Sequence, residues 1–275
     1  MPSRVVLLTG AAGGIGRVMT QALLADGHKV AAVDRDPLSL ERLKALCQSN
    51  DRLHCVVAQL ELEAGCRRAV EETQKRFGRV EAVINNAGIG MSAIRPDAEA
   101  RHPGIEELTV QTFDRFFQIF VRAPAIITRL ALPIMKAGGF GRVVNNTTSY
   151  LTMLRVLPYG AAKAALESMS AVWAAELKDT AVTVNVLVPG GPTDTPLIND
   201  ASGWPRDKML RPEIMGPPIR WLISDEAAGF NGQRITAARW DAKLPPSEAL
   251  KTASRAIGWP ELGADAVWLT GWNAK

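Results

Sequence analysis

The stretch Val5-Val6-Leu7-Leu8-Thr9-Gly10-Ala11-Ala12-Gly13-Gly14-Ile15-Gly16 determines which fold the chain can adopt. Its first four residues form an unbroken apolar run, which is typical of a strand buried on both faces of a parallel sheet. The glycines that follow predict a tight turn into a helix, where free backbone amides and the helix dipole favour a bound pyrophosphate. The chain therefore opens with a strand, a turn and a helix suited to holding a dinucleotide.

Short apolar segments rich in β-branched residues alternate with longer segments of helical period along the rest of the chain. This alternation predicts an α/β fold: a single domain with a doubly wound, parallel, seven-stranded sheet and helices on both faces, a Rossmann fold. We expect strands at residues 4–9, 29–34, 53–57, 80–84, 141–147, 182–188 and 234–238. We expect helices at residues 15–25, 38–47, 65–77, 112–135, 159–178 and 212–224.

The composition restricts the possible partners. The chain has 275 residues, is 47% hydrophobic and carries a net charge of +4. Because its basic residues are spread out, we expect no nucleic-acid partner, and we find neither a leader segment nor an apolar run of membrane length. The three cysteines, Cys47, Cys55 and Cys66, form no ligand pattern with the histidines. We therefore expect no metal, reduced thiols and a cytoplasmic protein.

The second expected strand ends at Asp34, where a carboxylate can accept hydrogen bonds from the adenosine ribose of a dinucleotide. Its charge would repel the 2′-phosphate of NADP, so the sequence favours NAD. Arg17 and Arg35 keep NADP open as the alternative, because either guanidinium could pair with that phosphate. Both arginines could equally be solvated or paired with nearby carboxylates.

Tyr159-Gly160-Ala161-Ala162-Lys163 starts the helix expected at 159–178, so Tyr159 and Lys163 share one face, a single turn apart. A free phenol has a pKa of about 10 and is a poor base at neutral pH, but a neighbouring ammonium and an oxidised nicotinamide would favour the phenolate. Tyr159 is therefore a candidate general acid and base. The alternative, an aromatic anchor beside a solvated lysine, is disfavoured by the dinucleotide turn upstream.

Four motifs occur in order at the ends of expected strands or the starts of helices. They are Thr9 to Gly16, Asn85-Asn86-Ala87-Gly88, Tyr159 with Lys163, and Pro189-Gly190. Together they resemble the short-chain dehydrogenases and reductases, in their compact single-domain branch, over roughly residues 4–238. The resemblance implies a dinucleotide-binding catalytic domain at residues 1–241, hydride transfer between the nicotinamide C4 and a carbinol carbon, and a homo-oligomer, either a tetramer or a dimer.

The resemblance also implies a role for each matching residue. Tyr159 would exchange a proton with the substrate oxygen, while Lys163 would hold the nicotinamide ribose and lower the pKa of the tyrosine. Asn86 to Gly88 would line the adenosine side, and the segment from Pro189 to Thr193 would meet the nicotinamide end. The full expected set of cofactor contacts is Gly10, Ala12, Gly13, Gly14, Ile15, Gly16, Asp34, Arg35, Gln59, Leu60, Asn86, Ala87, Gly88, Tyr159, Lys163, Pro189, Gly190, Pro192 and Thr193.

Three positions depart from the pattern of the family. The family usually has a serine about a dozen residues before its tyrosine, to hydrogen-bond the substrate oxygen. Here Thr148 takes that place, with Ser149 one residue further on; we favour Thr148, although either hydroxyl could polarise a carbonyl or merely cap the strand end. Phe120 replaces an asparagine that helps to hold a water next to the lysine, so proton relay must run differently, be slower or be dispensable. Gln59 replaces an aspartate that contacts the adenine amine, and its amide oxygen could accept the same bond.

Three segments lie outside the simple alternation. The long segment 88–120 is either a lid that offers a cation to an anionic substrate or a solvated loop. Residues 189–210 resemble the flap that closes over nicotinamide and substrate in the family. Residues 242–275 form a C-terminal extension that we expect to pack on the domain or on a neighbouring subunit. The side chains behind these expectations are Arg95, Arg101 and His102 in the first segment and Trp259, Trp268 and Trp272 in the extension.

The sequence thus predicts an oxidoreductase that acts on CH–OH groups and transfers a hydride between NAD and a small secondary alcohol or ketone, with Tyr159 as general acid and base. The main alternative is a dinucleotide-binding structural or regulatory protein with little turnover, which Phe120 and Thr148 favour. Sugar-nucleotide epimerisation on a related fold is disfavoured by the glycine spacing. No motif identifies the substrate.

Overall fold

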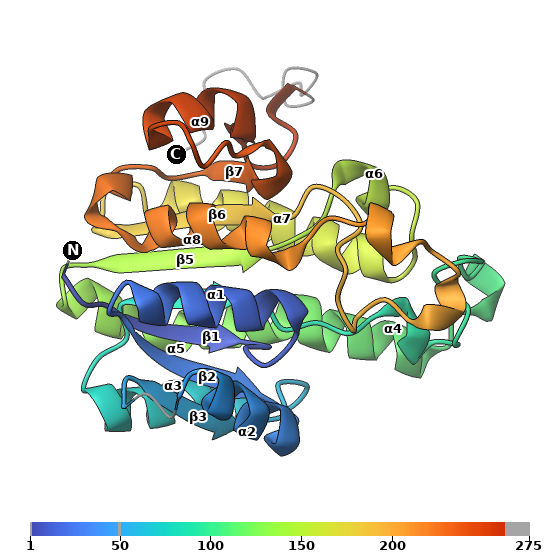
Figure 1. Ribbon diagram of the computed structural model, residues 1–275, viewed down its shortest axis with the longest axis horizontal. Helices are drawn as coiled ribbons and strands as arrows, with labels where there is room; N and C mark the ends of the chain where they lie inside the picture. Colours follow the sequence, from blue (N-terminus) through green and yellow to red (C-terminus); the bar gives the residue numbers. More distant parts are fainter. Residues whose placement is uncertain (1, 49–50, 262–275) are drawn as a thin grey trace, which may run out of the picture.

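Buried apolar runs form the strands of an eight-stranded sheet, which Figure 1 shows for the computed structural model. The structure describes residues 2–48 and 51–261. The strands stand in the order β3-β2-β1-β4-β5-β6-β7-β8. The chain changes its direction of winding between β1 and β4, so the carboxyl ends of these strands border the crevice where such sheets bind ligands. The strands are β1 (Val5–Thr9), β2 (Lys29–Asp34), β3 (Leu53–Val57), β4 (Ala82–Asn85), β5 (Gly141–Asn146), β6 (Val182–Val188), β7 (Gln233–Thr236) and β8 (Ser254–Ala256).

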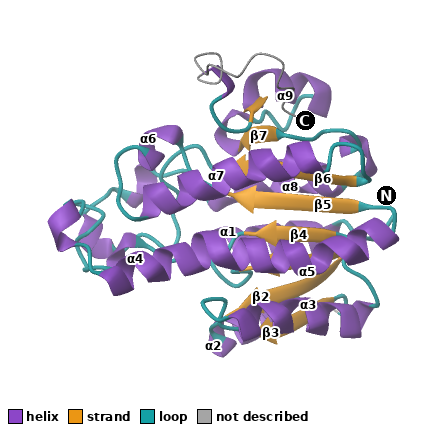
Figure 2. Ribbon diagram, turned by 180° about the vertical axis from the view of Figure 1, so that it is seen from behind, coloured by secondary structure: helices purple, strands orange, loops and turns teal. Residues whose placement is uncertain are grey.

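Helices cover both faces of the sheet, which confirms the doubly wound fold class (Figures 1 and 2). One face packs against α1, α2 and α8, and the other packs against α3, α5 and α7. In Figure 1 the strand arrows point to the right, where α6, the start of α4 and the segment after β6 gather at the carboxyl edge. The helices are α1 (Gly14–Ala25), α2 (Pro37–Leu46), α3 (Glu63–Phe77), α4 (Val110–Phe117), α5 (Ala123–Ala137), α6 (Tyr150–Met153), α7 (Tyr159–Glu176), α8 (Gly216–Ile223) and α9 (Pro246–Ala253).

The sheet has one strand more than the sequence predicts, and that strand is antiparallel. β8 pairs with β7, with Ile235 opposite Ser254 and Gln233 opposite Ala256. A strand of three residues is too short to show an alternating pattern, so the sequence gives no sign of it. β8 covers the edge of β7, whose backbone groups would otherwise be unpaired. The described part of the extension therefore packs on its own domain.

The helix predicted over residues 112–135 is two helices, α4 and α5, joined by the π-helical turn η3 (Gln118–Arg122). A π turn accommodates one extra residue and changes which side chains face inward; here Ile119 and Phe120 are buried. The stretch Val110–Ala137 is long and apolar enough, by length and composition alone, to cross a membrane. This corrects the expectation that no such segment occurs, although Phe116 and Ile127 within it are buried in the core of the domain.

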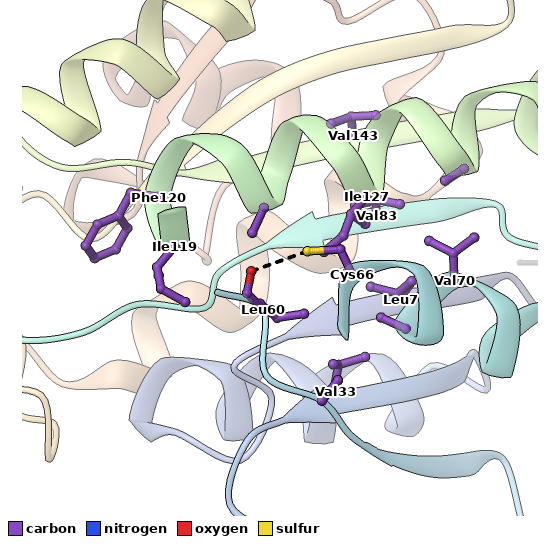
Figure 3. Packing of buried hydrophobic residues seen from close by; sticks show 14 of the residues in the cluster. Leu7, Val33, Leu60, Cys66, Val70, Val83, Ile119, Phe120, Ile127 and Val143 are labelled. Carbon is purple, nitrogen blue, oxygen red and sulfur yellow. Dashed lines mark hydrogen bonds between the residues drawn. The ribbon is translucent and has the colours of Figure 1, made fainter. Parts of the chain in front are cut away.

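The core beneath α3 and α5 contains Cys66, as Figure 3 shows. The Cys66 thiol donates a hydrogen bond of 3.4 Å to the carbonyl of Leu60. Burial raises the pKa of Cys66 to about 11, so the thiol stays protonated at neutral pH. Cys47 and Cys55 are also free thiols, both half-buried. The cysteines therefore act as apolar filling within the described part of the chain.

Replacing Phe116 by alanine tests this core. Phe116 is fully buried, so we expect Phe116→Ala to lower the free energy of unfolding by about 3–5 kcal/mol. Phe113 lies on the same helix but is 41% exposed, and Phe113→Ala should cost less than about 1 kcal/mol. Urea unfolding followed by far-ultraviolet circular dichroism measures both values. Equal losses would contradict the packing described here.

Candidate active site

The glycine turn between β1 and α1 is compact. Gly10 has a φ of +62°, and a Cβ atom there would lie 2.7 Å from the Cα of Ala87. A Cβ atom at Gly16 would lie 2.0 Å from the carbonyl oxygen of Gly10. Side chains are thus excluded where the first turn of α1 meets β1 and β4, while Gly13 stays exposed. This close-packed cradle fits the phosphates of a dinucleotide, which require direct approach to backbone amides.

Asparagine side chains tie the ends of three strands together beside this turn. The Thr9 hydroxyl accepts hydrogen bonds of 3.0 Å from the backbone amides of Asn86 and Ala87. The Asn86 amide donates to the carbonyl oxygens of Thr9 and Gly10, at 3.0 and 3.2 Å. Asn146, at the end of β5, donates to the Asn86 side-chain oxygen at 2.9 Å. The segment Asn86 to Gly88 is thereby fixed as one wall of the crevice.

Asp34 stands at the end of β2, as predicted, and faces the glycine turn. One carboxylate oxygen accepts from the Ala12 amide at 3.1 Å, and the other from the Arg35 amide at 2.7 Å. The Arg35 guanidinium is exposed and lies 3.9 Å from Glu61, so it is not turned toward the turn. This carboxylate suits the ribose hydroxyls of the dinucleotide better than it suits a 2′-phosphate.

Two of the predicted cofactor contacts lie at the same edge but differ in exposure. Gln59 is exposed there, so its side chain is accessible to an adenine. Leu60 is buried in the core cluster with Cys66, so its side chain serves packing instead.

The segment after β6 lies over the glycine turn. A Cβ atom at Gly14 would lie 2.5 Å from Cγ2 of Thr195, so this threonine contacts the turn directly. Thr193, predicted to contact the cofactor, is buried and donates to the Gly191 carbonyl at 3.1 Å, while Pro192 is exposed. The sequence reasoning missed the contact of Thr195. The only sign of this contact in the sequence is the glycine at position 14, because a side chain there would collide with Thr195.

The predicted catalytic residues come together where β5 meets α7. Burial raises the pKa of Tyr159 to about 12, although an interaction of its phenol with the Thr148 side chain lowers it. The Lys163 ammonium donates to the Asn146 carbonyl at 2.5 Å, and burial lowers the pKa of Lys163 to about 7. Ser149 instead caps α6, accepting from the Thr152 amide at 3.1 Å. Of the two candidate hydroxyls, Thr148 is the one that reaches Tyr159.

Phe120 fills the place next to this pair. Its ring lies edge-on to the Tyr159 ring, with centroids 5.3 Å apart, and the Lys163 nitrogen lies 4.3 Å from its centroid. A Cβ atom at Gly88 would lie 2.8 Å from the same ring. The aromatic ring replaces water beside Lys163, which explains why desolvation dominates the pKa of this lysine.

A buried ion pair contacts the backbone of Thr148. Arg234 of β7 and Glu167 of α7 lie 2.7 Å apart, with side chains 6% and 0% exposed. Arg234 also donates to the Thr148 carbonyl, and the Thr147 hydroxyl donates to Glu167 at 2.7 Å. Sequence reasoning missed this pair, and its only signal was a charged residue inside each of two apolar elements.

The C-terminal extension joins the same network. The Gly258 amide donates to Glu167 at 3.4 Å, and the Tyr150 hydroxyl donates to the Gly258 carbonyl at 2.7 Å. The Trp259 ring lies 5.7 Å from the Tyr150 ring. Trp268 and Trp272, also expected to dock, lie outside the described residues.

In the long segment after β4, the arginines form ion pairs with carboxylates of the same segment. Arg95 contacts Asp97 at 2.5 Å, and Arg101 contacts Glu107 at 3.0 Å. His102 is exposed. These arginines therefore offer little free charge to an anionic substrate, contrary to the lid hypothesis. In the part of the chain that the structure describes, no group of three histidine, cysteine or carboxylate side chains could hold a metal ion.

Comparisons with known proteins agree with this site. The family model described as short chain dehydrogenase matches residues 4–205. An uncharacterized oxidoreductase, YxjF, of Bacillus subtilis is 30% identical over 259 residues, which cover 86% of this chain and 96% of the relative. The NADPH-dependent aldehyde reductase 2 of Arabidopsis thaliana is 27% identical, over 86% of this chain and 93% of the relative.

A solved structure shares the fold as well. The 3-ketoacyl-(acyl-carrier-protein) reductase of Brucella melitensis, solved in complex with NADH, superposes with a TM-score of 0.70 at 28% identity, and the match covers 82% of this chain and 94% of that one. The chain therefore belongs to the short-chain dehydrogenase family and is an NAD(P)-dependent oxidoreductase that acts on CH–OH groups.

Proposed function

We propose that the protein transfers a hydride between NAD and a secondary alcohol or ketone, with Tyr159 as the proton donor and acceptor. The observation that carries this proposal is that the side chains of Thr148, Tyr159 and Lys163 meet where β5 ends and α7 begins. Two hydroxyl groups that meet at the carboxyl edge of the sheet can hold one carbonyl oxygen between them. Lys163 lies one helical turn from Tyr159 and completes the set.

The proton chemistry follows from burial. Because the pKa of Tyr159 is about 12, the phenol stays protonated through neutral pH and is ready to donate its proton to a developing alkoxide. Thr148 donates a second hydrogen bond to that oxygen and fixes its position. A bound nicotinamide dinucleotide supplies or accepts the hydride. Reduction of a ketone is therefore the direction that the resting protonation state favours at neutral pH.

NAD is the proposed cofactor because Asp34 faces the glycine turn and Arg35 lies against Glu61. The charge of the carboxylate opposes a 2′-phosphate at that place. Relatives are mixed on this point, since one solved neighbour is a complex with NADH and another relative is named as NADPH-dependent. The proposal therefore depends on this chain's own residues. The homo-oligomer and the cytoplasmic location stay predictions.

One observation favours the second candidate function, a dinucleotide-binding protein with little turnover. Phe120 excludes water from Lys163, so a lysine whose pKa is about 7 carries its charge only below that pH. A partly neutral lysine lowers the pKa of Tyr159 less than an ammonium does. Binding of NADH without turnover of any alcohol or ketone would support this candidate against the first.

Substitutions at the hydroxyl groups test the proposed catalysis. Tyr159→Phe should abolish turnover while leaving the Kd for NADH nearly unchanged, because the lost group acts on the substrate. Thr148→Val should lower kcat roughly 10²- to 10³-fold, since one hydrogen-bond donor to the reacting oxygen is lost. Ser149→Ala is the matched control and should affect stability rather than kcat, because Ser149 caps α6. Activity that survives in Tyr159→Phe would refute the assignment.

The pH dependence tests the role of Phe120. Alcohol oxidation needs the phenolate of Tyr159, so its rate should rise with pH from neutral toward 10. In Phe120→Asn, water can reach Lys163, so the pKa of Lys163 rises. The lysine then stays charged to a higher pH, and its charge lowers the pKa of Tyr159. The oxidation profile should then move to lower pH by about one unit. Phe113→Asn, on the exposed side of α4, is the control, and profiles that coincide for both variants would contradict this account.

Replacing Asp34 tests cofactor choice. The native protein should bind NADH at least about tenfold more tightly than NADPH, because the carboxylate repels the 2′-phosphate. In Asp34→Ser this preference should shrink or reverse. Fluorescence titration with both reduced cofactors measures it without any substrate. Tighter binding of NADPH by the native protein would show that Asp34 has another role.

A further inference from the structure

A cavity of about 250 Å³ opens beside the catalytic groups, at the carboxyl edge of the sheet. Two of its lining residues are Ser149 and Gly190, which directly follow Thr148 at the end of β5 and Pro189 at the end of β6. Arg234, which donates to the Thr148 carbonyl, forms part of its wall. The cavity is therefore linked to Thr148 in two ways, through the adjacent residue Ser149 and through the hydrogen bond from Arg234.

Three arginines line the cavity: Arg234, Arg239 and Arg255. The charge of Arg234 is balanced by Glu167 at 2.7 Å. No ion pair joins Arg239 or Arg255 to a carboxylate in residues 2–48 and 51–261. Arg255 donates to the Ser254 carbonyl at 2.6 Å, which orients its guanidinium but does not neutralise it. Two of the arginines that line the cavity thus carry a positive charge without a counter-charge among the described residues.

The arginines of the segments after β4 and after β6 differ in this respect. Those of the segment after β4 are paired with Asp97 and Glu107. Those of the segment after β6 are Arg206 and Arg211, and both lie 2.9 Å from Asp194. Of the two arginines in the cavity lining that lack an ion pair within the described part of the chain, Arg255 lies in the extension expected at residues 242–275, and Arg239 lies just before it.

We propose that this cavity binds an anionic group of the substrate, a carboxylate or a phosphate, while the ketone or alcohol of the same molecule meets Thr148 and Tyr159. A guanidinium presents paired donors in a plane that match the oxygens of either anion. The Thr236 hydroxyl, which also lines the cavity, adds a neutral donor. The inference rests on the proposed function, because it assigns the substrate class for the same site.

Matched pairs of ketones test the proposal. The first pair is 4-oxopentanoate and its methyl ester, and the second is dihydroxyacetone phosphate and dihydroxyacetone. In each pair, kcat/KM with NADH is measured for the anion and for its neutral partner, and the ratio of the two values is compared among variants. The first pair reports on carboxylates and the second on phosphates.

Arg239→Gln and Arg255→Gln should each lower the anion-to-neutral ratio about 5- to 20-fold in at least one pair, since each removes charged donors. The ratio in the native protein should also fall as salt is added, because partly exposed charges are screened. Arg68→Gln, an exposed arginine on α3 at the other end of the sheet, is the matched control for net charge and should leave the ratio unchanged. If neither Arg239→Gln nor Arg255→Gln changes the anion-to-neutral ratio in either pair of ketones, the proposal is wrong.

Binding of inorganic phosphate separates this proposal from the proposed function. Isothermal titration at low ionic strength should detect binding to the native protein, weakened about 5- to 20-fold in Arg239→Gln and in Arg255→Gln. If phosphate binds in this way while none of the ketones is reduced, the anion site stands and hydride transfer to ketones fails. If ketones are reduced but neither phosphate binding nor the ratio depends on these arginines, the function stands and the anion site fails.

Discussion

Burial of ionisable groups behind β5 and β6 is the constraint on which the rest of the site depends. Lys163 and the Arg234–Glu167 pair lie where water is excluded, and Tyr159 is half-buried beside Lys163. A buried ionisable group must be paired with an opposite charge or become neutral. Arg234 and Glu167 are paired, and their pairing fixes Thr148. Lys163, which Phe120 covers, is partly neutral because burial lowers its pKa to about 7.

The fold could be predicted because its signals are local and repeated. β2, β3 and β6 begin and end at the predicted residues, since short, mainly apolar runs leave few alternatives. β8 and the π-helical turn could not be predicted. The pairing of β8 depends on the open edge of β7, and η3 turns Ile119 and Phe120 toward a core that a single helix pattern does not reveal.

The site divides in the same way. The glycine turn, Asp34, Tyr159 and Lys163 could be found because each is a short motif with a fixed place in the fold. The choice between Thr148 and Ser149 needed coordinates, because one residue of register decides which hydroxyl meets the phenol and which caps α6. Arg234 and Glu167 lie far apart in sequence, and the cavity next to them brings together residues of β5, β6, β7 and β8. These residues are brought together by the order of the strands in the sheet, which their spacing in the sequence does not reveal.

The hydrogen bond from Gly258 to Glu167 bears on the order in which the protein is made. A chain leaves the ribosome from its N-terminus, and early segments fold before late ones exist. The glycine turn, Tyr159 and Lys163 all emerge well before β7 and β8. Until Arg234 has emerged, Glu167 lacks the guanidinium that balances its charge, and the Gly258 amide adds its hydrogen bond later still. The nascent protein can thus assemble its dinucleotide cradle early, but its catalytic centre is completed only after β7 and β8 have emerged.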